Sequence, residues 1–244
     1  MARYPSSGVS YSFGPGGITP AVKILIITNV IAFVLNLIVD VMTIRLGLWP
    51  KAVFEDLALW QPFTYMFLHS IAGVGHVLIN MLSLWMFGTE LERTWGTRFF
   101  TKYYFVTGVG AAATSLLLSL FVDGIYYSVT VGASGAIYGL LLAYALYFPD
   151  RPIYMYMVFP IPAKYFVMIM GALAFFSSIG ERSGVANATH LGGLIVAYLF
   201  LKSGRLHPIA EVKYRYLKWK INRTRAKFDV YTGGRANDWD RRVH

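Results

Sequence analysis

The sequence contains no cysteine. This absence excludes a disulfide framework, a cysteine nucleophile and any metal site built on thiolates. It is equally compatible with reducing and oxidising compartments, so it does not indicate where the protein resides.

Charge is also scarce. Only 14% of the residues are Asp, Glu, Lys or Arg, whereas 56% are hydrophobic. A soluble domain carries about 25% charged residues. The shortage is uneven, because long stretches hold no charge while the C-terminal end is crowded with it. We therefore expect a lipid bilayer, rather than water, to surround most of the chain.

The N-terminal stretch is polar and rich in Gly, Ser and Pro. It has no basic region leading directly into a short apolar run with a small-residue cleavage site, so we expect no signal peptide. We interpret residues 1–21 as a flexible cytoplasmic N-terminus, and we expect the first apolar segment to remain in the mature protein.

Six apolar segments without acidic residues follow. Since a backbone in lipid must pair its own polar groups, each segment is predicted to be a helix. The expected fold is an all-α integral membrane protein in which residues 22–202 form a bundle of six transmembrane helices. Several segments fall short of the ~20 residues that a simple span needs. The segments run approximately over Val22–Val39, His76–Phe87, Tyr103–Val122, Ser134–Phe148, Tyr165–Ile179 and Thr189–Leu201.

The 40–75 segment is long, moderately polar and rich in aromatic residues such as Trp49 and Trp60. This composition is typical of a loop in the outer membrane interface, where aromatic rings lie at headgroup depth. The alternative is an abortive additional span, but Pro50, Pro62 and two acidic residues interrupt it.

The distribution of basic residues predicts the orientation. With the N-terminus inside, the inner segments hold nineteen Lys and Arg residues and the outer segments hold three. Basic residues favour the cytoplasmic side, so both termini are expected there. This arrangement suits a multi-pass protein of the bacterial inner (plasma) membrane.

Most of the net charge of +10 belongs to residues 203–244, which we interpret as a basic cytoplasmic tail. Residues 209–228 resemble a basic amphipathic helix that could contact anionic lipid, and a solvated, partly disordered tail is the alternative. We do not expect nucleic-acid binding.

One polar cluster opens the fourth apolar segment, in the sequence Gly132-Ala133-Ser134-Gly135. Ser134 stands where free backbone N–H groups and the helix dipole favour negative charge. A serine there could attack a carbonyl while its own N–H stabilises the oxyanion. Gly135 and Gly139 form a small-residue face that permits close helix packing. The alternative is a serine that merely caps the helix.

A second cluster, His190-Leu191-Gly192-Gly193, opens the sixth segment and also carries a small-residue face. Two such faces could bring Ser134 and His190 within hydrogen-bond distance. A serine hydroxyl needs a base to take its proton, and neutral imidazole is the commonest one. Taken alone, His190 could equally be a structural hydrogen-bonding residue.

A third cluster opens the second segment, where His76 and Asn80 lie one turn apart on the same helical face. Both side chains can donate hydrogen bonds, so together they could stabilise an oxyanion. The alternatives are a polar contact between helices or half of a metal site. A metal is not expected, because the predicted spans contain no Asp, Glu or Cys to complete its shell.

These three motifs, in the chain order His76, Ser134 and His190, resemble those of the rhomboid intramembrane serine proteases. The resemblance covers about Val22 to Leu201. It implies six helices and a Ser–His dyad without an acidic third member. Ser134 would be the nucleophile and His190 the general base. An oxyanion hole would comprise His76, Asn80 and the Ser134 backbone N–H.

The resemblance assigns further roles. Tyr138 matches an aromatic residue that stacks on the base histidine, although ordinary core packing would also explain it. Gly135 and Gly193 match packing glycines. Trp60-Gln61 replaces a Trp-Arg pair and Thr189 replaces an alanine, and we expect the first change to affect only the docking of the outer loop.

We therefore expect a serine endopeptidase that cleaves transmembrane protein substrates near the outer membrane face and needs no cofactor. One rival is a catalytically inactive relative that binds membrane helices. A second is a transporter or channel, but the sequence shows no convincing internal repeat and no carboxylates within the spans.

Overall fold

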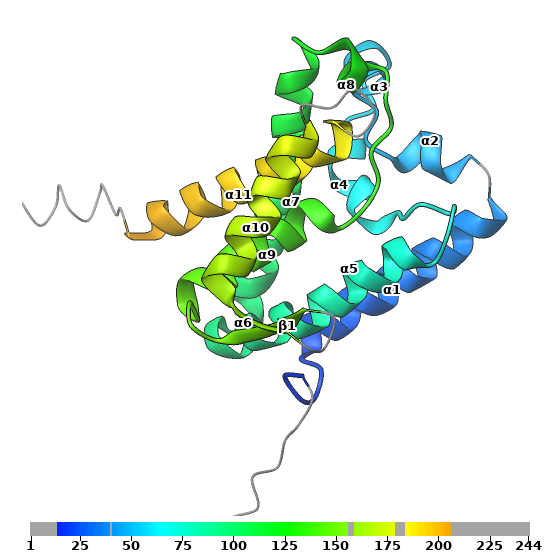
Figure 1. Ribbon diagram of the computed structural model, residues 1–244. Helices are drawn as coiled ribbons and strands as arrows, with labels where there is room; N and C mark the ends of the chain where they lie inside the picture. Colours follow the sequence, from blue (N-terminus) through cyan, green and yellow to red (C-terminus); the bar gives the residue numbers. More distant parts are fainter. Residues whose placement is uncertain (1–13, 40, 156–158, 179–183, 206–244) are drawn as a thin grey trace, which may run out of the picture. The chain divides into compact units, whose positions relative to one another are not determined.

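The computed structural model describes residues 14–39, 41–155, 159–178 and 184–205. Residues 1–201 form one compact unit and residues 202–244 a second. The first unit contains all six apolar segments, and the prediction that the chain is mostly helical is confirmed (Figure 1). The tail helix predicted over residues 209–228 lies outside the described residues, as does most of the predicted N-terminal segment.

Each apolar segment is mostly helical over its described residues. The second apolar segment lies in one continuous helical rod, in which a π-helical turn, η2, joins α5 to α6. Gly96 separates α6 from α7, because its φ of 78° lies in the left-handed region that favours glycine. The helices are α1 (Pro20–Ile38), α5 (Gly75–Ser83), η2 (Leu84–Gly88), α6 (Thr89–Trp95), α7 (Thr97–Ser119), α9 (Ser134–Tyr147), α10 (Ala163–Ser178) and α11 (Gly184–Arg205).

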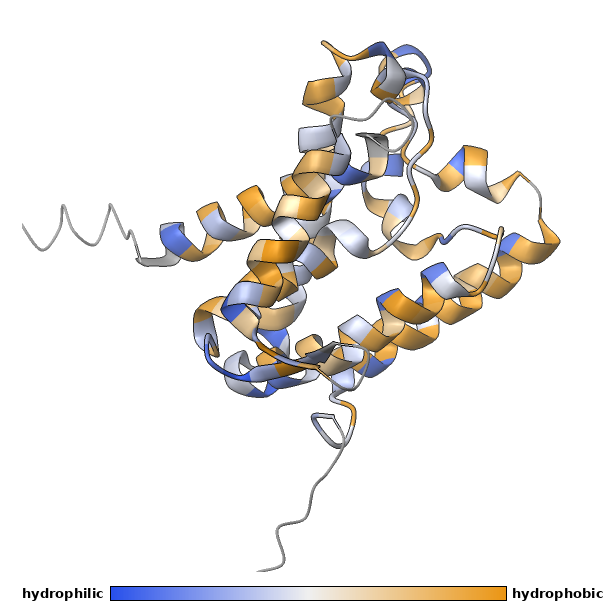
Figure 2. Cartoon of the chain, viewed as in Figure 1, coloured by the Kyte–Doolittle hydropathy of each residue, from blue (hydrophilic) through white to orange (hydrophobic). Residues whose placement is uncertain are grey.

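Large apolar side chains cover much of the outward surface of these helices. Ile24, Leu78 and Phe176 are all exposed, and Figure 2 shows α1 hydrophobic along most of its length. Soluble monomers rarely expose such extensive apolar surface. Among the described helices, only α1 is by itself long and apolar enough to cross a membrane. The count of six spans therefore stays a prediction.

The described residues of the 40–75 segment, 41–75, fold into short helices rather than one continuous helix. Gln61, which is buried, accepts a hydrogen bond from the backbone N–H of Trp49 at 2.9 Å. The indole of Trp60 donates to the carbonyl of Arg45 at 2.8 Å. The pair Trp60-Gln61 thus fastens the segment to itself. Its elements are α2 (Met42–Leu46), α3 (Pro50–Glu55), α4 (Gln61–Thr64) and η1 (Tyr65–Phe67).

Two further elements, one of them a hairpin, were not predicted. The strands β1 (Pro152–Met155) and β2 (Phe159–Pro162) pair antiparallel between α9 and α10. Pro152 and Pro162 lie opposite each other at one end of the pairing, and prolines are tolerated here because a two-stranded ribbon has only edge strands. The other is the short helix α8 (Asp123–Tyr126), which follows α7.

Helix α9 forms the centre of the unit and packs closely on α7. The hydroxyl of Tyr103 donates to the carbonyl of Gly139 at 2.7 Å. A methyl group at Gly139 would lie 2.9 Å from Cβ of Thr107, so this contact requires glycine. Because α9 is buried on most sides, its apolar residues form no single stripe.

The carboxylate of Glu92, on α6, fixes the start of α1 to the end of the rod that α5, η2 and α6 form. It accepts hydrogen bonds from the backbone N–H groups of Ala21 and Val22 and from the hydroxyls of Thr19 and Thr97. These N–H groups belong to the first turn of α1 and have no partner within their own helix. Burial alone would raise the pKa of Glu92, but the four hydrogen bonds lower it overall.

We predict that Glu92→Gln destabilises the fold by about 2 kcal/mol or more, because the new amide N–H₂ faces donors and the charge-assisted bonds are lost. The effect should depend on pH. The depressed pKa means that Glu92 contributes its full stability above its ordinary pKa of 4.5. That contribution is lost as the pH falls through the folded-state value. Thermal unfolding in detergent across a pH series measures it.

Glu90→Gln is the matched control, because Glu90 lies on the same helix and pairs with Arg151 in a partly exposed ion pair. Such pairs contribute about 0–1 kcal/mol. Equal losses for the two variants, or a Glu92 effect that persists unchanged in acid, would contradict the assignment.

Candidate active site

Ser134 and His190 meet in the structure. Ser134 begins α9, whereas His190 lies almost two turns into α11, which begins at Gly184 rather than at the histidine as the sequence suggested. The Oγ of Ser134 and Nε2 of His190 are 2.8 Å apart, which is hydrogen-bond distance. Residues 56 positions apart in the sequence are thus brought together.

The two helices can approach this closely because glycine lines their contact. A methyl group at Gly193 would overlap the carbonyl oxygen of Gly135, so backbone touches backbone at this point. Thr189 is buried, and its methyl group also lies near Gly135. The small-residue faces predicted on Gly135 and Gly193 therefore meet each other directly.

The ring of Tyr138 lies against the imidazole of His190. The ring centroids are 4.3 Å apart and the planes are inclined by only 8°, so the rings stack. Tyr138 lies one turn after Ser134 on α9, which places nucleophile and stacking ring on the same face. Tyr138, on the helix that carries the serine, therefore fixes the orientation of the imidazole plane.

The backbone that leads into Ser134 is held by the 40–75 segment. Gly132, whose φ is 130°, donates its N–H to the carbonyl of Tyr65 at 3.0 Å. The hydroxyl of Tyr65 donates in turn to the carbonyl of Gly108 at 2.7 Å. Leu48 and Thr130 form an isolated antiparallel bridge just upstream. Sequence reasoning missed Tyr65, since a tyrosine in an aromatic-rich loop gives no specific signal.

His76 faces the same small space as Ser134. A methyl group added at Gly132 would lie 3.1 Å from Nε2 of His76 and 3.5 Å from Oγ of Ser134. The Nδ1 atom of His76 lies 3.2 Å from the backbone N–H of Ser70, which donates to it. A neutral imidazole that accepts at Nδ1 must carry its proton on Nε2. His76 therefore presents an N–H donor on the side nearest Ser134.

Asn80 is buried next to His76 on the same face of α5. Its Nδ2 donates to the carbonyl of His76 at 2.7 Å, within the helix. An amide N–H₂ group has two hydrogens, so one remains for another acceptor. The participation of Asn80 in an oxyanion hole remains a prediction.

The other ring nitrogen of His190, Nδ1, has no hydrogen-bond partner among the described residues. A carboxylate that would orient the imidazole is thus not found at Nδ1 in the described part of the chain. Over the same residues, no group of three or more His, Cys, Asp or Glu side chains could hold a metal ion.

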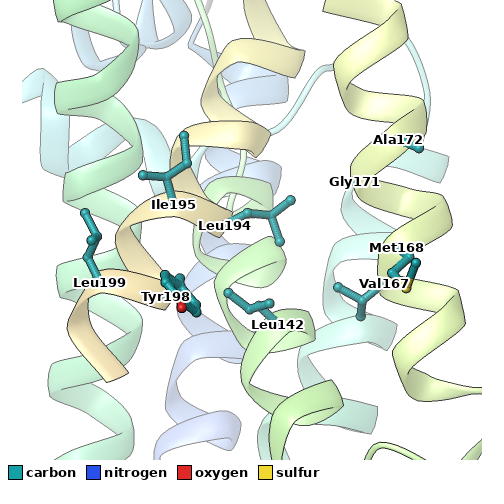
Figure 3. A pocket seen from close by; sticks show the side chains of 9 residues that line it. All are labelled: Leu142, Val167, Met168, Gly171, Ala172, Leu194, Ile195, Tyr198 and Leu199. Carbon is teal, nitrogen blue, oxygen red and sulfur yellow. The ribbon is translucent and has the colours of Figure 1, made fainter. Parts of the chain in front are cut away.

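An apolar hollow of about 440 Å³ lies between α9, α10 and α11 (Figure 3). Leu142, which lines it, follows Ser134 by eight residues, or about 12 Å along a helix. The lining offers no imidazole, amine or carboxylate, so the hydrolytic groups lie elsewhere. The lining residues are Leu142, Val167, Met168, Gly171, Ala172, Leu194, Ile195, Tyr198 and Leu199.

A bundle of apolar helices that places a serine hydroxyl within hydrogen-bond distance of a histidine is typical of one class of protein, membrane proteins built like serine hydrolases. The comparison with known families agrees, because residues 56–204 match the Rhomboid domain. The chain belongs to the rhomboid family, whose members are integral membrane proteins. The resemblance noted in the sequence is thereby confirmed.

Curated relatives are found in plants, bacteria and mitochondria. RHOMBOID-like protein 2 of Arabidopsis thaliana is 29% identical over 183 residues, which are 75% of this chain and 53% of the relative. Rhomboid protease AarA of Providencia stuartii is 32% identical over 57% of this chain and 54% of its own length. Rhomboid protein 1, mitochondrial, of Saccharomyces cerevisiae is 31% identical over 51% of this chain and 36% of its own length. The chain thus spans between a third and about half of these relatives.

We predict that Gly193→Ala separates Ser134 from His190, because the new methyl group forces α11 away from the Gly135 carbonyl. Overpacking of this kind costs about 1–3 kcal/mol. Labelling of Ser134 by a serine-reactive fluorophosphonate should fall steeply in the folded variant. Gly171→Ala is the control, since its methyl group would meet only Leu194 at an ordinary 3.4 Å. Normal labelling of both variants would refute this account of the contact.

Proposed function

We propose that this protein is an intramembrane serine endopeptidase that cleaves transmembrane proteins near the outer membrane face. The observation that carries the proposal is the 2.8 Å distance between Oγ of Ser134 and Nε2 of His190. Membership of a family that includes a bacterial protein named as a protease supports it.

The reaction is acyl transfer in two halves. Nε2 of His190 takes the hydroxyl proton while Oγ of Ser134 bonds to the carbonyl carbon of the scissile amide. The protonated imidazole then gives that proton to the leaving nitrogen as the C–N bond breaks, which leaves an acyl-enzyme. Water attacks the ester with His190 again as base, and a carboxylic acid and free Ser134 result.

Among the described residues, no carboxylate orients the base at Nδ1. To accept at Nε2, neutral His190 carries its proton on Nδ1. Stacking on Tyr138 and the tight contact between α9 and α11 then do what an acidic residue does in a triad. Position is supplied by packing, and the charge of the imidazolium is stabilised by the polarisable ring against it.

The tetrahedral oxyanion needs donors that face Ser134. The Ser134 backbone N–H belongs to the first turn of α9, where N–H groups lack helical partners and the dipole favours negative charge. Nε2 of His76 supplies a second donor. Asn80 supplies a third through its remaining amide hydrogen. Each such donor typically contributes about 2.7–4 kcal/mol to the barrier reduction.

The substrate class follows from the setting. A transmembrane helix hides its amides in hydrogen bonds, so a substrate must unwind locally at the cut, and residues that weaken helices favour cleavage. We place the six apolar segments across a bacterial inner membrane with both termini in the cytoplasm. The basic tail contacts anionic lipid on that side.

We predict that reconstituted wild-type protein cleaves a single-span reporter and reacts with a fluorophosphonate. Ser134→Ala should abolish both activities. His190→Ala should reduce both by at least about 10³-fold, since removal of a catalytic base leaves only background catalysis. A folded wild-type protein that neither cleaves any reporter nor reacts with the probe would instead be a catalytically inactive, helix-binding relative.

We also predict that Tyr138→Phe retains most of the activity, because the stacked ring persists. Tyr138→Ala should lower kcat at least about tenfold, since the imidazole loses its fixed plane and misplacement of a reacting group is costly. Steady-state cleavage with the folded fraction normalised by thermal unfolding measures the difference. Equal losses in both variants would show that the hydroxyl, rather than the stack, matters.

A further inference from the structure

Buried asparagine side chains on α1 need an explanation, because polar groups inside an apolar helix are costly. Asn29 and Asn36 are both almost completely buried. Asn29 donates to the carbonyl of Leu25 in its own helix. Asn36, two turns later, instead reaches out of α1 to another part of the chain.

Asn36 holds the backbone between η1 and α5. Its Nδ2 donates to the carbonyl of His69 at 3.3 Å, and its Oδ1 accepts from the hydroxyl of Thr43 at 3.1 Å. The Thr43 bond fixes which way the amide points. The amide therefore anchors His69 from the side of α1.

The anchored residue stands directly before the partner of His76. Ser70, which follows His69, donates its backbone N–H to Nδ1 of His76 at 3.2 Å. The ring of His69 is fully buried and lies edge-on to the ring of His76, with centroids 5.1 Å apart. Both the hydrogen bond and the ring contact thus depend on where residues 69 and 70 are held.

We propose that Asn36 is a positioning residue that fixes the tautomer and orientation of His76 through the His69–Ser70 backbone. This inference rests on the proposed function for its kinetic consequence. With Ser70 in place, Nδ1 of His76 is an acceptor and Nε2 carries the proton that faces the oxyanion. Without the anchor, Ser70 moves away and both neutral tautomers become accessible. Only one of them can donate from Nε2.

The experiment is a double-mutant cycle with Asn36→Leu and His76→Ala in reconstituted protein. Asn36→Leu should lower kcat about tenfold with little change in KM, short of the ~10²–10³-fold cost of removing an oxyanion donor outright. In the His76→Ala background it should have no further effect, because the group it positions is gone. An Asn36→Leu loss of the same size in both backgrounds overturns the proposal.

Asn29→Leu is the matched control. It removes an equally buried amide from the same helix, one that donates to the carbonyl of Leu25 rather than to that of His69, so kcat should stay unchanged. If Asn36→Leu fails to fold, Thr43→Val removes only the hydroxyl that orients the Asn36 amide. It should show a smaller loss of kcat with the same dependence on His76, and a normal kcat for a folded Thr43→Val counts against the proposal.

A readout independent of activity separates the two levels of inference. ¹⁵N spectra of labelled imidazole, with the His76 signals assigned by His76→Gln, should show an unprotonated Nδ1 and a protonated Nε2 in wild type. Asn36→Leu should give a mixture of tautomers. A clean wild-type tautomer that persists in Asn36→Leu overturns the inference even if the protein is a protease. A mixture in the variant supports it even if no substrate is cleaved.

Discussion

The contact between the Gly135 carbonyl and Gly193 is the constraint on which the candidate site depends. Helices that carry side chains at their contact keep their axes about 8–10 Å apart. Here, backbone meets backbone, and this brings the hydroxyl of Ser134 within reach of the imidazole of His190. In lipid the hydrophobic effect does not drive helices together, so close van der Waals packing of small residues must supply the attraction.

A second layer of structure holds the groups that surround Ser134 and His190. Carbonyls and N–H groups of the 40–75 segment fix the strand-like stretch before α9, through the bond from Gly132 to Tyr65 and the bridge between Leu48 and Thr130. The same segment delivers the Ser70 N–H to His76. A segment that composition describes only as an aromatic-rich interfacial loop is therefore part of the framework of the candidate site. The segment is too apolar for a free loop because its short helices bury part of its apolar side chains.

Much of this could be predicted from the sequence because bilayers impose simple rules. Apolar segments must be helical, and a serine and a histidine carried by two helices with glycine faces can meet only in a few ways. Backbone-mediated contacts could not be predicted. Tyr65 and Ser70 make their contacts through a backbone carbonyl and a backbone N–H group, and the side chain of Asn36 donates to a backbone carbonyl, so none of these contacts leaves a pattern of paired side chains in the sequence. The hairpin of β1 and β2 was not predicted either, because its prolines are more typical of loops than of strands.

Nδ1 of His190 has no hydrogen-bond partner in the part of the chain that the structure describes, and this distinguishes the candidate site from a triad. In a triad a carboxylate selects the tautomer of the base and stabilises the imidazolium by charge. A carboxylate inside a helix bundle would itself be costly to bury, so its desolvation would offset much of that benefit. Stacking on Tyr138 orients the ring without introducing a second charge. In the proposed mechanism, rigid packing thus replaces electrostatic orientation, and the tightness of the α9–α11 contact becomes a requirement of the proposed chemistry rather than of stability alone.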